Sequence, residues 1–174
     1  MPKIIENVRG QLLAEARRQV AQHGYADTTI RSVAGACGLG VGTVYNYFKS
    51  KEMLIATFVY EEWVKYLEEM ASLPNDAPRV LLGGIFDCLR RFAAENAKLF
   101  TDTEAAKLIA SGFSSRHKIL REQIASFIIP LCERNGLDAP VFSAEFLAEA
   151  LIGWSMNGVE FDVVYPILEK IIKN

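Results

Sequence analysis

The chain has 174 residues, of which 51% are hydrophobic and 23% are charged, and this composition favours a folded protein over a disordered one. No apolar run approaches the roughly 20 residues that a membrane-spanning helix needs, so we expect no membrane partner. The net charge of −2 hides an asymmetry, because residues 1–51 carry a net charge of +4 and the remainder carries −6. A basic first segment before an acidic remainder indicates a nucleic-acid partner for the first segment.

Helix signals follow one another along the whole chain. Apolar residues recur at spacings of three and four, and no segment alternates with period two for long enough to form a strand. Gly24 is placed to end the first helix, Thr28-Thr29 to cap the second and Ser50 to cap the fourth. The expected helices cover residues 4–22, a short stretch after residue 29, and residues 41–48, 51–73, 79–95, 103–111, 115–134, 143–158 and 161–173.

This order predicts an all-α protein with two domains. Residues 1–50 are expected to form a small three-helix domain, and residues 51–174 a larger helical domain. The first residues carry Lys3 and Glu6 and lack the hydrophobic block of a signal peptide, so we expect a cytoplasmic protein.

Residues 28–51 hold the most informative pattern, TTIRSVAGACGLGVGTVYNYFKSK. Two short helices joined by a glycine-containing turn, behind a supporting helix, are typical of helix-turn-helix units. Gly38 is expected to take the left-handed conformation of that turn, which most side chains resist. With Val44 and Phe48 turned inward, the groups left outside can reach phosphates or base edges. These groups are Thr43, Tyr45, Asn46 and Tyr47, with Lys49 and Lys51 beside them.

The run from Gly24 to Glu52 resembles the DNA-binding domain of TetR-type (tetracycline-repressor-like) transcriptional regulators. The matching positions are Gly24-Tyr25, Thr28-Thr29-Ile30, Val33-Ala34, Gly38-Leu39, Gly42-Thr43-Val44-Tyr45, Tyr47-Phe48 and Lys51-Glu52. The resemblance implies phosphate contacts from Thr29, Tyr47 and Lys51, and backbone or base contacts from Thr43, Tyr45 and Arg31. The expected DNA-binding residues are therefore Thr29, Arg31, Gly42, Thr43, Tyr45, Asn46, Tyr47, Lys49 and Lys51.

The sequence departs from the TetR-type pattern at the start of the recognition helix. Gly40 and Val41 stand where a polar residue and then a basic or polar residue are usual, so fewer groups remain for reading bases. The leading expectation is a repressor that a small, mainly apolar ligand releases from a palindromic operator. The alternative is a helical protein-interaction module with a degenerate DNA-binding head.

Neither a catalytic constellation nor a cofactor motif is apparent. The run from Gly38 to Gly42 lacks the preceding strand and the full spacing of a phosphate-binding loop. His23 and His117 stand apart from acidic or cysteine clusters, so we expect no enzyme, metal or cofactor. Cys37, Cys88 and Cys132 are odd in number and widely spaced, which favours buried thiols, with a redox sensor as the alternative.

With the helix-turn-helix pattern, the resemblance implies that residues 1–50 form a helix-turn-helix DNA-binding domain and that residues 51–174 form a helical effector-binding and dimerisation domain. A homodimer places two recognition helices on successive half-sites of an operator, and the resemblance implies that the last two helices form the interface. The expected interface residues are Phe146, Ala150, Gly153, Trp154, Asn157, Val164, Leu168 and Ile171. The expected effector contacts are Trp63, Tyr66, Phe86, Cys88, Arg90, Phe92, Phe100, Phe113, Phe127 and Asn157. A shift of the fourth helix on ligand binding would then change the spacing of the two recognition helices.

Overall fold

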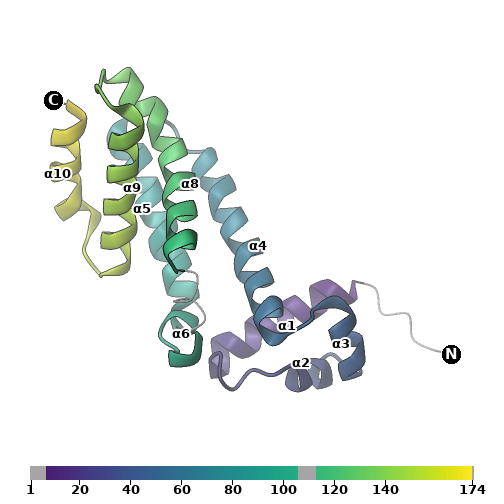
Figure 1. Ribbon diagram of the computed structural model, residues 1–174. Coiled ribbons are helices and arrows are strands. Elements are labelled where there is room, and N and C mark those ends of the chain that lie inside the picture. The colour runs from purple at the N-terminus through teal and green to yellow at the C-terminus, as the bar shows by residue number, and fades with distance from the viewer. Residues whose placement is uncertain (1–6, 106–112, 174) are drawn as a thin grey trace. The chain divides into compact units, whose positions relative to one another are not determined.

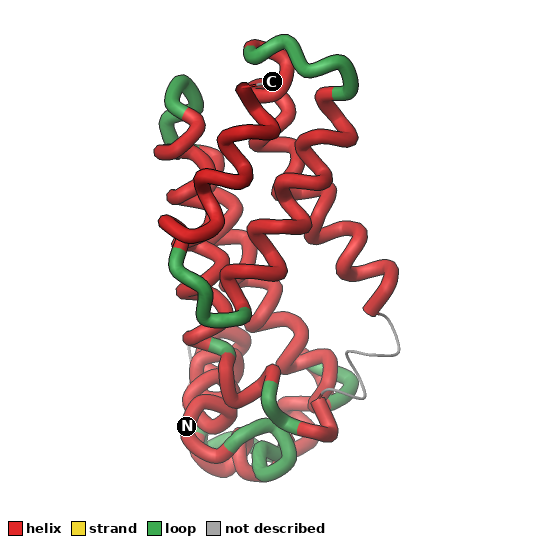
Figure 2. Tube along the Cα trace, turned by 90° about the vertical axis from the view of Figure 1, so that its left-hand side faces the viewer, coloured by secondary structure: helices red, strands yellow, loops and turns green. Residues whose placement is uncertain are grey.

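The computed structural model describes residues 7–105 and 113–173, without the side chains of residues 113–115. Every regular element in these ranges is a helix (Figures 1 and 2), which confirms the expected all-α class. The helices are α1 (Val8–His23), α2 (Ile30–Ala36), α3 (Val41–Tyr47), α4 (Lys51–Ala71), α5 (Pro78–Glu95), α6 (Ala97–Phe100), α8 (Phe113–Arg134), α9 (Pro140–Met156) and α10 (Phe161–Lys173).

Two segments differ from the expected helices. The short helix α6 was not predicted, because four residues are too few to show a periodic pattern. Of the helix expected at residues 103–111, residues 103–105 are helical and the rest lies outside the described residues. No helix among the described residues is long and apolar enough to cross a membrane.

The chain forms two compact units, which we call the head unit and the body unit. The head unit comprises Met1–Trp63 with Asn96–Ile109, and the body unit comprises Val64–Glu95 with Ala110–Asn174. By packing, the head unit thus extends beyond residue 50, the expected boundary, into α4 and α6. The division at residue 50 was predicted from function, as the end of the DNA-binding residues, and in that sense it remains a prediction.

The head unit is built around the apolar faces of α1, α2, α3 and the start of α4. Leu12 and Ala16 from α1, Val33 from α2 and Val44 from α3 are fully buried in one cluster with Leu54 from α4. Leu99 and Ala105 belong to the same cluster, and this explains why residues after 96 belong to the head unit. Burial of these side chains fixes the angle at which α3 projects from the unit.

Glycine and cap residues set the ends of the head helices as the sequence predicts. Gly24 ends α1 with φ +87°, and Gly38 in the turn between α2 and α3 has φ +67°. Thr29 is the N-cap of α2, where its side chain accepts a hydrogen bond from the Ser32 amide at 3.0 Å. These signals are local, so they could be recognised without knowledge of the tertiary fold.

The body unit packs α5, α8, α9 and α10 with the second half of α4. Helix α8 runs along α9, and α5 contacts α8, α9 and α10. Close helix contact is possible at Gly83 and Gly84 of α5, because a Cβ there would lie 3.0 Å from Phe161 and 2.7 Å from Leu73. The core includes Leu82, Ile85, Leu89, Ile124, Ile128, Leu147 and Leu151, each fully buried.

Candidate nucleic-acid interface

Helix α3 presents a single uncharged polar face to solvent. Val44 is completely buried, and successive residues of an α-helix are turned by about 100°, so Gly42 and Asn46 form the outermost line of the helix. Thr43 and Tyr45 lie on the two flanks of that line. Tyr45 is 46% exposed and Tyr47 is 47% exposed, which leaves both aromatic rings free to contact a partner. The structure therefore brings together the group that the sequence predicted for α3.

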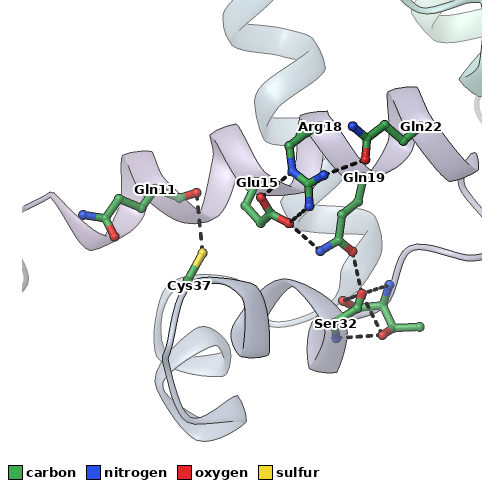
Figure 3. A network of polar contacts seen from close by, with 8 residues as sticks. Gln11, Glu15, Arg18, Gln19, Gln22, Ser32 and Cys37 are labelled. Atoms are coloured by element: carbon green, nitrogen blue, oxygen red, sulfur yellow. Dashed lines mark hydrogen bonds and ion pairs between the residues drawn. The ribbon is translucent and has the colours of Figure 1, made fainter.

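Helix α2 is fixed to α1 by a network of polar contacts, shown in Figure 3. The Ser32 hydroxyl donates to Gln19 Oε1 at 2.6 Å, and the Gln19 amide donates to Glu15 at 2.7 Å. Arg18 in turn forms an ion pair of 2.6 Å with Glu15, which helps hold the pKa of this carboxyl below its usual range. The network holds α2, and with it the Thr29 cap, against the supporting helix.

Thr29 has a structural role in addition to the phosphate contact that the resemblance implies. Its backbone amide donates to the Ser32 hydroxyl at 3.0 Å while its own hydroxyl caps α2, which together make a capping box. Thr29 is nevertheless exposed, so a phosphate can approach it. The first turn of α2 is thus both stabilised and accessible.

The surface around α2 and α3 lacks negative charge. Residues 28–50 contain Arg31 and Lys49 and no Asp or Glu, although the whole chain has 21 acidic residues. Arg31 is exposed and makes no hydrogen bond or ion pair with any residue that the structure describes. By contrast, the α1 residues Arg9 and Arg17 form ion pairs with Glu61 and Glu62 of α4 at 2.7 and 2.5 Å. Arg31 therefore leaves a positive charge beside α3 that a polyanion can meet, whereas Arg9 and Arg17 are already neutralised.

Lys51 lies where α4 meets the turn between α1 and α2. Its ammonium donates to the Tyr25 carbonyl at 3.0 Å and lies 4.0 Å from the centre of the Tyr25 ring. The Tyr25 hydroxyl donates to Glu52 at 3.1 Å. Hydrogen bonds, led by that from the Ser50 hydroxyl, lower the pKa of Glu52, while burial and Glu52 raise the pKa of Tyr25. This junction, absent from the sequence-based expectation for Lys51, joins the first turn of α4 to the helices that hold α3.

The cysteines give little support to redox sensing. Cys88 and Cys132 are buried as expected, whereas Cys37 is only half-buried and its thiol donates to the Gln11 carbonyl at 3.8 Å. Desolvation raises the pKa of all three thiols, that of Cys88 to about 11. A raised pKa lowers the fraction of reactive thiolate, so the structure favours the structural role for these residues.

The expected effector residues differ in their burial. Tyr66 and Phe92 pack edge to face in the body unit, with ring centres 5.6 Å apart, and burial raises the pKa of Tyr66 to about 12. Trp63, Phe86 and Cys88 are also buried. Phe127 is half-buried, whereas Arg90, Phe100 and Asn157 are exposed, and the side chain of Phe113 lies outside the described residues. For the buried residues of this set, a place in the hydrophobic core is sufficient to explain why their side chains are apolar.

The expected interface residues divide between surface and core. On α9, Phe146 and Trp154 are 53% and 49% exposed, Gly153 is exposed and Ala150 is half-buried. Asn157, the C-cap of α9, is also exposed. On α10, however, Val164 and Leu168 are buried within the protomer, and Ile171 is half-buried. The large apolar residues of α10 that are exposed are instead Val163 and Ile167, which directly precede Val164 and Leu168 in the sequence. Phe142 of α9 is also exposed, and its spacing of four from Phe146 could have identified it.

The fold and sequence are similar to those of bacterial regulators. Residues 12–57 match the family described as "Bacterial regulatory proteins, tetR family". The chain is 23% identical over 169 residues to the HTH-type transcriptional repressor AcnR of Corynebacterium diphtheriae, with 94% of this chain and 76% of the relative covered.

Solved structures resemble this chain over nearly its full length. A TetR-family transcriptional regulator from Pectobacterium atrosepticum aligns with a TM-score of 0.64 and 23% identity, covering 94% of this chain and 88% of that one. BioQ, solved with its double-stranded DNA operator, aligns with a TM-score of 0.60 and 18% identity, covering 95% and 97%. At these identities, the structural likeness establishes the fold.

Proposed function

We propose that the chain is a repressor of the tetR type, which binds a palindromic operator as a homodimer; the match of residues 12–57 to that family and the similarity to the repressor AcnR support this. A small, mainly apolar ligand is proposed to release it. Such a protein acts by binding DNA rather than as an enzyme, which is also what the sequence predicts.

The outer face of α3 is the observation that carries the DNA-binding part of the proposal. A recognition helix must expose several groups that form hydrogen bonds while its opposite side holds it in place. Tyr45, Asn46 and Tyr47 are exposed, and the completely buried Val44 anchors the helix. The absence of acidic residues from 28 to 50 removes the repulsion that a phosphate backbone would otherwise meet.

The exposed apolar face of the body unit supports a homodimer. Phe142, Phe146 and Trp154 on α9 and Val163 and Ile167 on α10 are all more than two-fifths exposed. Exposed apolar residues at this density are typical of protein interfaces rather than of a solvated helix pair. Two copies joined through these helices would present two α3 helices to successive half-sites, which one seven-residue helix alone cannot cover.

Effector release is proposed to act through α4. This helix contributes residues up to Trp63 to the head unit and residues from Val64 to the body unit. We propose that the ligand inserts among aromatic groups of the body unit such as Tyr66 and Phe92, whose rings pack edge to face. If a ligand moved α4, the contacts of Lys51 and Glu52 with Tyr25 would move the turn between α1 and α2 with it. Ligand and operator would then oppose each other, with a coupling of about 1–3 kcal/mol.

Selection of bound sequences from a random DNA pool tests the proposal. We expect a palindrome to be enriched, with affinity that falls steeply as salt rises. Tyr47→Ala should weaken operator binding, whereas Tyr60→Ala, which truncates a 63% exposed tyrosine on α4, should leave it unchanged. Weak binding that neither salt nor Tyr47→Ala alters would contradict DNA recognition and favour the protein-interaction alternative.

A further inference from the structure

We propose that α3 reads A·T base pairs, with the Asn46 amide on an adenine and with Thr43 and Tyr45 against thymine methyl groups. This inference rests on the proposed function and adds the class of base pair that the operator offers to α3. It follows from the position of Asn46, from the chemistry of its neighbours and from the two glycines at the start of the helix.

Asn46 projects directly away from the core of the head unit. It lies two residues after the buried Val44 and therefore about 200° around the helix. Its side chain is exposed, and its amide forms no hydrogen bond with any residue in the described part of the chain. An amide with a free donor and a free acceptor side by side is complementary to adenine N7 and N6 in the major groove.

The helix lacks the groups that usually recognise guanine. Guanine O6 and N7 are acceptors, and Arg or Lys is their commonest partner, but residues 41–48 contain neither. Lys49 follows the helix, and its ammonium lies back on the last turn, 3.4 Å from the Tyr45 carbonyl. Arg31 on α2 is the other nearby cation. If this surface recognises a guanine, we therefore expect Arg31 of α2 to contact it, and not a residue of α3.

Gly40 and Gly42 leave the start of α3 without bulk on the outer side. No atom lies within 4 Å of a Cβ built at Gly42, and the Thr43 hydroxyl is 3.9 Å from one at Gly40. The protein itself would thus accommodate larger residues at both positions. The bare backbone allows α3 to approach the edges of the bases closely, and this brings the Thr43 methyl and the Tyr45 ring near thymine methyl groups.

Base analogues in the selected operator test these contacts atom by atom. Replacing the adenine under Asn46 by 7-deazaadenine removes the N7 acceptor and should weaken wild-type binding about 10-fold, within the range for bidentate contacts. Replacing a thymine by deoxyuridine removes one methyl group and should weaken binding about 4-fold, as expected for one buried methyl. Asn46→Ala should bind the normal and the 7-deazaadenine operators equally, and Asn46→Gln should retain the preference for adenine.

The outcomes separate this inference from the proposed function. A palindrome with guanine or cytosine at every position that Asn46→Ala alters would overturn the inference while supporting operator binding. Equal wild-type affinity for the normal and 7-deazaadenine operators would also overturn it. A pool from which no palindrome is enriched would contradict the proposed function itself.

Discussion

The ammonium group of Lys51 lies between the carbonyl oxygen of Tyr25, at 3.0 Å, and the face of the Tyr25 ring, at 4.0 Å from its centre. Two favourable interactions with one residue hold the lysine in place at the start of α4. A half-buried ammonium keeps a further donor for a phosphate, so the same side chain can fix the position of α4 and bind DNA. Lys51 should therefore contribute both to the stability of the head unit and to the affinity for DNA.

Replacing Lys51 by Met should lower both stability and operator affinity. The variant loses a hydrogen bond and a cation–π contact, which together contribute about 1–2 kcal/mol to unfolding free energy. It also loses one phosphate contact, so the slope of log affinity against log salt should decrease by about one. Urea denaturation and binding titrations measure the two effects. Lys49→Met is the control, because Lys49 is exposed and its one hydrogen bond, to the Tyr45 carbonyl, is long at 3.4 Å, so its loss should weaken DNA binding with little change in stability.

Thr29 allows the helix cap to be separated from the DNA contact. Asp and Asn both cap helices well, so Thr29→Asp and Thr29→Asn should each retain the thermal midpoint of the wild type. Asp adds a negative charge on an exposed surface that faces phosphates, and Thr29→Asp should weaken operator binding at least 10-fold more than Thr29→Asn. Similar affinities for the two variants at low salt would show that the first turn of α2 does not approach the DNA backbone.

The head helices were predictable because their signals are local. Gly24 and Gly38 have positive φ, and Thr29 caps α2, so the residue types alone set these helix ends within a few positions. The outer face of α3 followed from the burial of Val44 and Phe48 in the same way. Local signals failed for α6, whose Asn96 N-cap makes no side-chain cap and whose four residues show no period.

Two other features could not be predicted from local signals: the charge that is available to DNA, and the face of α10 that is exposed. The net charge of +4 for residues 1–51 falls to +1 over residues 1–63, because Glu52, Glu61 and Glu62 of α4 belong to the head unit. Two of these carboxylates pair with Arg9 and Arg17, so the charge count overstated what DNA can meet. In α10, Val163 and Ile167 form one stripe and Val164 and Leu168 another, and spacing alone does not say which faces the core.

Gly38 should resist substitution for a conformational reason alone. Its φ of +67° lies in the left-handed region, yet no atom lies within 4 Å of a Cβ built there. Gly38→Ala should therefore destabilise the protein by about 1–2 kcal/mol, and Gly38→Asn should cost less because Asn tolerates this region better. Gly35→Ala is the matched control, since Gly35 is helical with equally open space and its substitution should be neutral or stabilising. Equal denaturation midpoints for Gly38→Ala and Gly38→Asn would contradict this account.

Asp102 should make the head unit more stable at neutral than at acid pH. Its carboxylate accepts hydrogen bonds from the amides of Ala105, at 3.1 Å, Ala26, at 3.1 Å, and Glu104, at 2.9 Å. These bonds, led by that from Ala105, hold the pKa of Asp102 below its ordinary value of 3.8. The charged form is favoured in the folded state, so its stabilisation is present above pH 3.8 and disappears as the pH falls through the lowered pKa.

Asp102→Asn isolates this contribution. At neutral pH the variant should have a lower thermal midpoint than the wild type, and the difference should shrink as the pH falls from about 6 to about 2.5. Asp27→Asn is the control, because Asp27 is exposed and its carboxylate forms no hydrogen bond with the described residues. A difference that stays constant over the whole pH range would mean that the charge of Asp102 has no part in stability.

Phe146 should decide the oligomeric state. It is 53% exposed on α9, between Phe142 and Trp154 on the same apolar face, so Phe146→Glu would place a charge in the middle of the proposed interface. Light scattering after size exclusion should show a dimer for the wild type and a monomer for Phe146→Glu, with unchanged helical content. Val80→Glu, at a 50% exposed apolar position on α5, should remain dimeric.

The monomeric Phe146→Glu variant should also bind the full palindrome no more tightly than a single half-site, because it no longer joins two α3 helices. A dimeric Phe146→Glu would place the interface elsewhere, and a monomeric wild type that still prefers the full palindrome would show that dimerisation occurs only on DNA.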